Sequence, residues 1–123
     1  MSKLDLRERD LVKCEDMRIY AERSQKYLGS FTLDQFLAND LVQAAVNRCL
    51  EIIGEASGLV SEKTRLRSKE IPWQRIAGMC NVHEYDVIEP RKVYETVTKH
   101  IPALIPQMNP LIRALEEEVG WGG

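Results

Sequence analysis

Residues 71–97 are the segment of this sequence that is richest in side chains suited to chemistry. They include His83, one of only two histidines in 123 residues, with Cys80, Asn81, Glu84 and Tyr85 close by. Because an imidazole changes its charge near neutral pH, His83 is the only good candidate for acid–base catalysis here. A lone histidine near a helix end is more often a capping or surface group, and the residues by themselves leave both interpretations open.

The spacing of this segment sets a condition on its geometry. His83 and Tyr85 are two residues apart, which places them about 200° apart around a helix. The two rings therefore share one site only if the helix ends close to them. Pro90 favours an end nearby, because the residue before a proline is pushed out of the helical conformation.

Metal binding is not expected in this segment. Cys80 and His83 have i, i+3 spacing and could both contact one ion, but two ligands are too few for a stable site. Cys14, Cys49 and His100 add no recognisable zinc spacing. We therefore expect no metal and no cofactor, and we interpret Cys14 and Cys49 as core residues.

The elements that must position the segment are predicted to be helices along almost the whole chain. No glycine or proline interrupts residues 4–28, and Gly29 is a natural stop for this first helix. Thr32 and Gln35 form a T-x-x-Q capping box that opens a short second helix. Asn39 or Asp40 can cap a third helix, whose apolar residues recur in steps of three and four from 42 to 59.

Charges and prolines divide the second half of the chain. We interpret the charged residues 61–70 as a helix end and a loop. Pro72 suits the first turn of a fourth helix, and Pro90 starts a fifth. Pro102 and Pro106 should kink or divide this helix before residues 111–119. The inward residues of the fifth helix are expected to be Val93, Tyr94, Val97 and Ile101.

These patterns predict one all-α domain over residues 1–123, built as a bundle of about five helices. Because long helices in a short chain expose much apolar surface, we expect a homodimer that buries a helix face. The apolar stretches are far shorter than the roughly 20 residues that span a bilayer, and the charged N-terminus has no signal-peptide pattern. Three cysteines, widely spaced, indicate reduced thiols, so we expect a cytoplasmic protein without membrane contact.

The charge balance narrows the function further. Lys and Arg number 17 against 19 Asp and Glu, a net charge of −2, which disfavours a protein that coats nucleic acid through bulk charge. A local basic patch remains open. The basic run of Lys63, Arg65, Arg67 and Lys69 is interpreted as a solvated turn, with contact to RNA phosphates or to a partner as the alternative.

Two other side chains have both a structural and a functional interpretation. Trp73 is expected to anchor the core, with a role at an interface as the alternative. Glu51, with Arg48 and Glu55, forms an ordinary ladder of helix charges. The alternative is that Glu51 pairs with Arg75 of the fourth helix and orients it.

Three motifs carry a resemblance to a known family. They are RCLEIIGEAS at residues 48–57, IPWQRIAGM at 71–79 and HEYDVIEPRKVYETV at 83–97. Through them, about residues 11–112 resemble the HepT-like members of the HEPN superfamily, which are small all-α ribonuclease toxins. The resemblance implies a HEPN-type helical bundle that dimerises, with the catalytic groups of two protomers facing one cleft.

The activity of the family is implied in the same way. Its signature is an arginine, four to six residues, a histidine, any residue and a tyrosine, and it cuts RNA without a metal. His83 and Tyr85 carry over onto the histidine and the tyrosine. In the implied mechanism the 2′-hydroxyl of RNA attacks the adjacent phosphate, His83 handles protons, and the arginine holds the negative charge of the transition state.

A partner is implied as well. HepT-like toxins are typically paired with a small nucleotidyltransferase antitoxin of the MNT type, encoded next to them. In several such toxin–antitoxin pairs the antitoxin silences the toxin by AMPylation of the motif tyrosine, which is Tyr85 in this sequence. Added phosphate charge beside an RNA-binding cleft would repel the substrate backbone.

The sequence departs from the family at the arginine. Cys80 stands where the arginine is expected, and two residues are missing before His83, whereas Asn81 matches. Arg75 is eight residues before His83, about 12 Å along and about 80° around a straight helix, which makes it a poor substitute. Losing one charge stabiliser costs on the order of 10²–10³ in rate, so we expect a weakened or inactive enzyme.

Two alternatives to a ribonuclease stay open at this point. The first is a non-catalytic binding subunit of a nucleotidyltransferase, which the missing arginine and the shortened spacing favour. The second is a plain helical scaffold in which Tyr85 has no special role. On the ribonuclease hypothesis, His83 is catalytic, and the candidate supporting residues are Asn81, Arg75 and Glu51.

Overall fold

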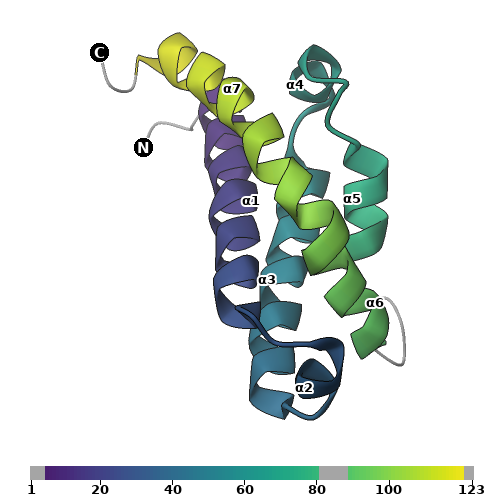
Figure 1. Ribbon diagram of the computed structural model, residues 1–123. Coiled ribbons are helices and arrows are strands. Elements are labelled where there is room, and N and C mark those ends of the chain that lie inside the picture. Colours follow the sequence, from purple (N-terminus) through teal and green to yellow (C-terminus); the bar gives the residue numbers. More distant parts are fainter. Residues whose placement is uncertain (1–4, 81–88, 121–123) are drawn as a thin grey trace.

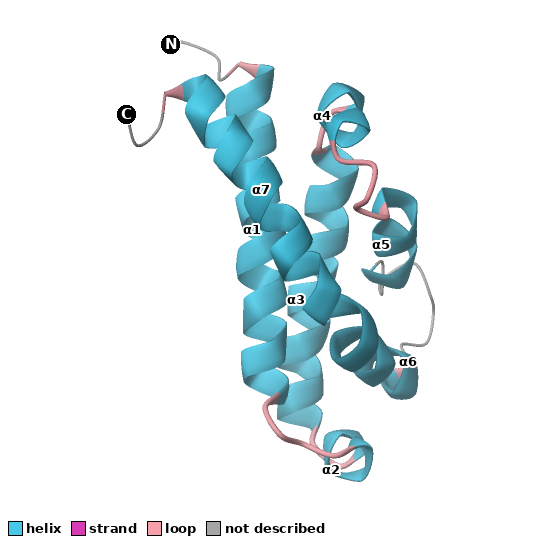
Figure 2. Cartoon of the chain, turned by 45° about the horizontal axis from the view of Figure 1, so that its top comes forward, coloured by secondary structure: helices cyan, strands magenta, loops and turns pink. Residues whose placement is uncertain are grey.

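The computed structural model describes residues 5–80 and 89–120, and Figure 1 shows them as a bundle of helices. The long helices are α1 (Leu6–Leu28), α3 (Asp40–Leu59) and α7 (Ile101–Val119). The short ones are α2 (Leu33–Leu37), α4 (Glu62–Arg67), α5 (Trp73–Cys80) and α6 (Pro90–Glu95), with the π-helical turn η2 (Thr96–His100) between α6 and α7. Among these residues there is no strand (Figure 2), which confirms the predicted all-α class.

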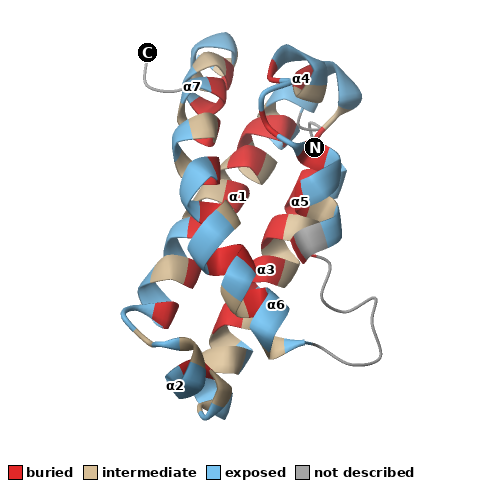
Figure 3. Ribbon diagram, turned by 45° about the vertical axis from the view of Figure 1, so that its right-hand side comes forward, coloured by how far each residue is buried: buried red, intermediate tan, exposed pale blue. Residues whose placement is uncertain are grey.

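The core forms where α1 packs along both α3 and α7. Buried residues lie on the facing sides of these helices, as the red segments of Figure 3 show. Burial of the apolar side chains is the main force that holds the bundle together. The buried stripe of α1 consists of Leu11, Cys14, Met17, Ala21 and Leu28. Cys14 and Cys49 are both buried, which confirms their interpretation as core residues.

The first helix ends, and the second and third helices begin and end, where the sequence predicts. Gly29 closes α1 with a φ of 55°, a conformation that other residues rarely adopt. The Thr32 and Gln35 capping box is present, since each side chain accepts a hydrogen bond from the backbone N–H of the other residue. Asn39 rather than Asp40 caps α3, and its side chain accepts from the Val42 N–H at 3.0 Å.

Residues 61–70 differ from their prediction, because part of this charged segment is the separate helix α4. The Ser61 side chain caps it by accepting a hydrogen bond from the Thr64 N–H at 3.3 Å. The helix start is also tied to α1 through Asp10, which is only 1% exposed. One carboxylate oxygen of Asp10 accepts from the Ser61 N–H at 2.9 Å, and the other accepts from the hydroxyls of Ser61 and Thr64. A buried charge with three donors is satisfied, so the contact fixes α4 against α1.

The predicted division of the C-terminal helix occurs at Pro102 but not at Pro106. Pro102 has no N–H to offer the carbonyl four residues back, and the chain widens into η2, where Ile101 donates to the Thr96 carbonyl five residues back. Pro106 and Pro110 lie inside α7, which continues through both, so of the expected kink or division at Pro106 the division does not occur. All three prolines are exposed and four residues apart. The carbonyls four residues before them, which receive no N–H from the prolines, can therefore bond water.

The helix after Pro90 faces the core as predicted. Val93, Val97 and Ile101 are buried, and Tyr94 packs against the core at its edge. The Tyr94 hydroxyl donates to the Phe31 carbonyl at 2.8 Å, and its ring centroid lies 5.7 Å from that of Phe36. These contacts hold α6 to α2 and its preceding turn. None of the described helices combines the length and apolarity needed to cross a membrane.

Removing the Asp10 carboxylate should weaken the fold. Asp10→Ala leaves the Ser61 N–H and two hydroxyls without their acceptor, so we expect the free energy of unfolding to fall by about 2–4 kcal/mol. Glu22→Ala, at an exposed position of the same helix, is the control and should change it by less than about 0.5 kcal/mol. Urea unfolding followed by circular dichroism measures both, and equal stability of the two variants would contradict the role of Asp10.

Candidate functional site

The predicted catalytic group lies between two well-defined helix ends. Asn81, His83 and Tyr85 fall outside the described residues, which stop at 80 and resume at 89. On the N-terminal side the chain leaves α5 at Cys80, and on the C-terminal side it enters α6 at Pro90. The placement of these two ends therefore fixes where the segment starts and finishes.

The first of these ends depends on how α5 is held. The helix packs on α3 and buries Trp73, Ile76 and Cys80. The Trp73 indole N–H donates to the Ser68 carbonyl at 3.1 Å, which satisfies its one polar group inside the protein. Trp73 is thus a core anchor, as predicted.

A glycine allows the end of α5 to come close to α3. A Cβ placed at Gly54 would lie 3.1 Å from the Cys80 carbonyl oxygen, 3.2 Å from its carbonyl carbon and 3.3 Å from its Cβ. Such distances are shorter than ordinary van der Waals contact. The absence of a side chain at Gly54 is therefore what lets the last turn of α5 lie on α3 at this depth.

Arg75 lies on α5 and contacts the start of α7. Its Nη2 is 3.3 Å from the Nδ1 of His100, across 25 residues of sequence. Because a guanidinium has only donors, the Nδ1 of His100 is the acceptor in this contact. Both side chains line a pocket of about 190 Å³ between α5 and the η2–α7 junction. His100 was expected from the sequence only as a candidate metal ligand, and its pairing with Arg75 was not predicted, because the two residues are 25 apart in sequence and no local pattern links them.

Glu51 has a local partner. Its Oε2 is 3.3 Å from the Nη1 of Arg48, three residues earlier on α3. This is the charge ladder expected for a helix surface. The structure therefore places Glu51 with Arg48, and Arg75 with His100.

Comparison with known proteins decides the family. The profile of the family described as Ribonuclease HepT-like matches residues 17–111. The chain belongs to the HepT-like ribonuclease family. No solved structure gives a significant match to it.

Relatives of this HepT-like chain come from archaea and bacteria. A protein of Methanocaldococcus jannaschii named "Putative RNase MJ0125" is 30% identical over 105 residues, which cover 84% of this chain and 90% of the relative. "Probable ribonuclease HepT" of Thermococcus cleftensis is 34% identical over 92 residues, covering 73% and 84%. A further RNase-named protein, from Caldanaerobacter subterraneus, is 33% identical over 84 residues, covering 67% and 75%.

Within this HepT-like chain, Cys80 is a packing residue. It has 0% of its surface exposed, and burial raises the pKa of its thiol to about 12. A thiol with this pKa stays protonated at neutral pH and is a poor nucleophile. The position where the resemblance expects the motif arginine therefore faces the α3 contact and supplies neither charge nor nucleophile.

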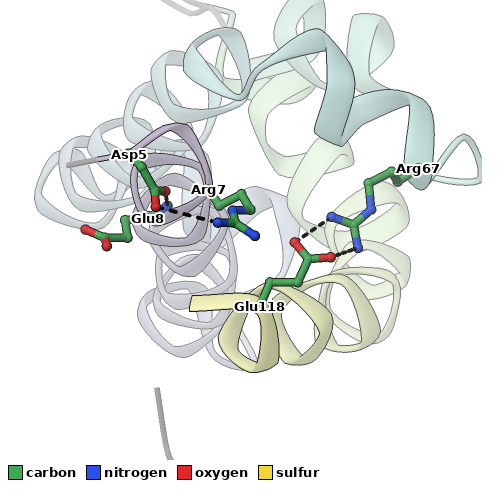
Figure 4. Close-up of polar contacts among 5 residues, drawn as sticks. All are labelled: Asp5, Arg7, Glu8, Arg67 and Glu118. Carbon is green, nitrogen blue, oxygen red and sulfur yellow. Dashed lines mark hydrogen bonds and ion pairs between the residues drawn. The ribbon is translucent and has the colours of Figure 1, made fainter. Parts of the chain in front are cut away.

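Part of the basic run has a structural role. Arg67 of α4 holds Glu118 of α7 through two contacts, Nη2 to Oε1 at 2.6 Å and Nη1 to Oε2 at 3.0 Å (Figure 4). The hydrogen bond from Arg67, with its charge, lowers the pKa of Glu118. The adjoining groove also contains Asp5 and Arg7, with the Nη2 of Arg7 3.9 Å from the Oδ2 of Asp5. Its charges are mixed, and we assign it no ligand.

Among the described residues, no cluster of three metal-binding side chains occurs.

The two glycines of α3 offer a matched test of the α3–α5 contact. Gly58→Ala, where no described atom lies within 4 Å of the new Cβ, should raise the free energy of unfolding by about 0.5–1 kcal/mol through helix propensity. Gly54→Ala gains the same propensity but must displace Cys80, at a cost of about 1–3 kcal/mol. We expect it to be less stable than the wild type by thermal unfolding. Equal stabilisation by both substitutions would contradict a tight contact at Gly54.

Proposed function

We propose that this protein is the toxin subunit of a HEPN/MNT-type toxin–antitoxin pair, a metal-independent endoribonuclease whose activity is weakened. It acts as a cytoplasmic homodimer on RNA, and its partner is a nucleotidyltransferase antitoxin. The observation that carries the proposal is the family match over residues 17–111, within which the sequence retains His83 and Tyr85 in the H-x-Y pattern.

The chemistry follows from the groups that the sequence retains. The 2′-oxygen of RNA forms a bond to the adjacent phosphorus while the bond to the 5′-oxygen of the next nucleotide breaks. His83 takes the proton of the 2′-hydroxyl or delivers one to the leaving oxygen, and the imidazoles of two protomers provide both roles. The products are a 2′,3′-cyclic phosphate and a 5′-hydroxyl.

The weakening has a physical cause. The two non-bridging oxygens of the phosphate carry more negative charge in the transition state than in the substrate, and the resemblance implies that an arginine stabilises this charge in family members. Cys80, buried and protonated, offers no such charge. The rate is therefore expected to be lower by on the order of 10²–10³ than for a family member with the arginine.

RNA cleavage by the purified protein tests this function. In the presence of a chelator, wild-type protein should cut unmodified RNA slowly but measurably, and His83→Ala should reduce the rate by about 10²-fold or more. Glu22→Ala is the control and should cleave like wild type. If the wild type and His83→Ala show the same background rate, the chain is not a working nuclease.

A second candidate function is a non-catalytic binding subunit of a nucleotidyltransferase. The burial of Cys80 favours it, because the arginine position cannot contribute to catalysis. This candidate requires stable co-purification with the partner and no toxicity of the chain alone.

The role of Tyr85 can be tested separately. After incubation with the partner and ATP, intact-mass analysis should show one or more added AMP units on the wild type and none on Tyr85→Phe. Tyr94→Phe, which removes a hydroxyl bonded to the Phe31 carbonyl, is the matched control and should be modified like wild type. Absence of added mass on the wild type would reject AMPylation as the regulation of this chain.

A further inference from the structure

The pocket between α5 and the η2–α7 junction collects basic side chains from two elements. Arg75 comes from α5, and Lys99 and His100 come from η2. Arg75 and Lys99 are exposed, whereas His100 is half-buried. Glu70 and Gln107 also line the pocket, and Cys80 belongs to its buried wall.

The π turn is what brings two of these residues to the pocket. Pro102 imposes the wider turn, and Lys99 and His100 are its last two residues. From there, Ala103 and Gln107 follow Lys99 at intervals of four residues and line the same pocket. Single π turns are rare, and they are found disproportionately at functional sites.

The polar groups of the pocket are mostly donors. The guanidinium of Arg75 has five N–H groups, and its contact with His100 is made through Nη2 alone. In the neutral form of His100, acceptance at Nδ1 leaves the proton on Nε2, which is a further donor. Lys99 adds three more. Among the described residues that line the pocket, one carboxylate, that of Glu70, stands against the charges of Arg75 and Lys99, so these side chains have a net positive charge although the chain carries −2 overall.

The size of the pocket and its donors fit an anion of one kind. At about 190 Å³, it is smaller than the roughly 300–1,000 Å³ of typical organic-ligand sites, and it suits a single phosphate group. The planar fork of an arginine matches the oxygens of a phosphate in pairs, and a lysine adds a point charge.

We propose that this pocket is a phosphate-binding subsite for the RNA backbone. Arg75 and Lys99 contact the phosphate, and His100 is a positioning residue that holds the guanidinium of Arg75. The inference rests on the proposed function, for which RNA is the substrate. Because Cys80 lines the pocket, the subsite supplies a positive contact next to the position where the resemblance expects the motif arginine.

Binding of a non-cleavable RNA tests the subsite. A fluorescent single-stranded RNA with 2′-O-methyl groups lacks the attacking hydroxyl, so its anisotropy reports binding alone. Arg75→Gln and Lys99→Gln should each raise Kd about three- to tenfold, equally for different sequences, and lower the slope of log Kd against log salt by about 1. Circular dichroism should show unchanged folding, since both side chains are exposed.

A matched control comes from α7, the helix that follows η2. Arg113 is an exposed residue of α7, 13 residues after His100 and about 20 Å along the helix. Arg113→Gln removes the same charge away from the pocket, and we expect it to change Kd less than twofold. If Arg75→Gln and Lys99→Gln bind like Arg113→Gln, or if the wild type does not bind this RNA, the subsite is rejected.

The positioning role of His100 has its own readout. His100→Ala should weaken binding in the wild type but have no further effect in the Arg75→Gln background, because it acts through Arg75. Additive effects would show that His100 acts independently and would overturn the positioning role.

The subsite and the nuclease can fail separately. Pocket-dependent binding of the 2′-O-methyl RNA without cleavage of unmodified RNA keeps the subsite and rejects the nuclease. Cleavage of unmodified RNA by a protein whose binding does not depend on Arg75 or Lys99 keeps the nuclease and rejects the subsite.

Discussion

The burial of one face of α1 against two helices at once organises the subunit. The stripe from Leu11 to Leu28 faces both α3 and α7. The core is therefore complete only when the N-terminal and C-terminal thirds of the chain are packed together. Each helix alone has too little apolar surface to be stable in water, and the contacts among the three provide that stability together. The shorter elements are then placed relative to this frame.

The placement of the candidate site depends on α3 in particular. One side of this helix contributes Val46, Leu50 and Ile53 to the core, and α5 packs against it as well. Gly54 sits where the backbone of Cys80 lies close to α3. The position of Cys80, the last described residue before the segment with His83, is thus set by close packing of one helix on the other. A packing change in α3 would therefore move the end of α5 even though no candidate site residue is substituted.

The sequence predicted the features of the fold that depend on neighbouring residues. Contacts between residues far apart in the sequence could not be predicted. Gly29, the Thr32 capping box and Asn39 act on the residues beside them, so the first three helices were correct. The helix α4 was missed because the carboxylate that stabilises its start, Asp10, is 51 residues from Ser61 in sequence. The contact of Arg75 with His100, 25 residues apart, escaped prediction for the same reason. For the site, the sequence predicts His83 and Tyr85, which lie outside the described residues, and an altered arginine position at Cys80, which the structure shows to be buried.

The π turn at Thr96–His100 also constrains how the length of this chain can change. A π turn holds one residue more than an α turn would need at the same place. Five residues at the wider π pitch turn the chain about as far as four residues of an α-helix do. Deletion of one residue from this turn would therefore leave Tyr94 facing the Phe31 carbonyl that it now bonds. Insertion of one more residue would instead rotate α6 by about 100° relative to α7 and break that bond.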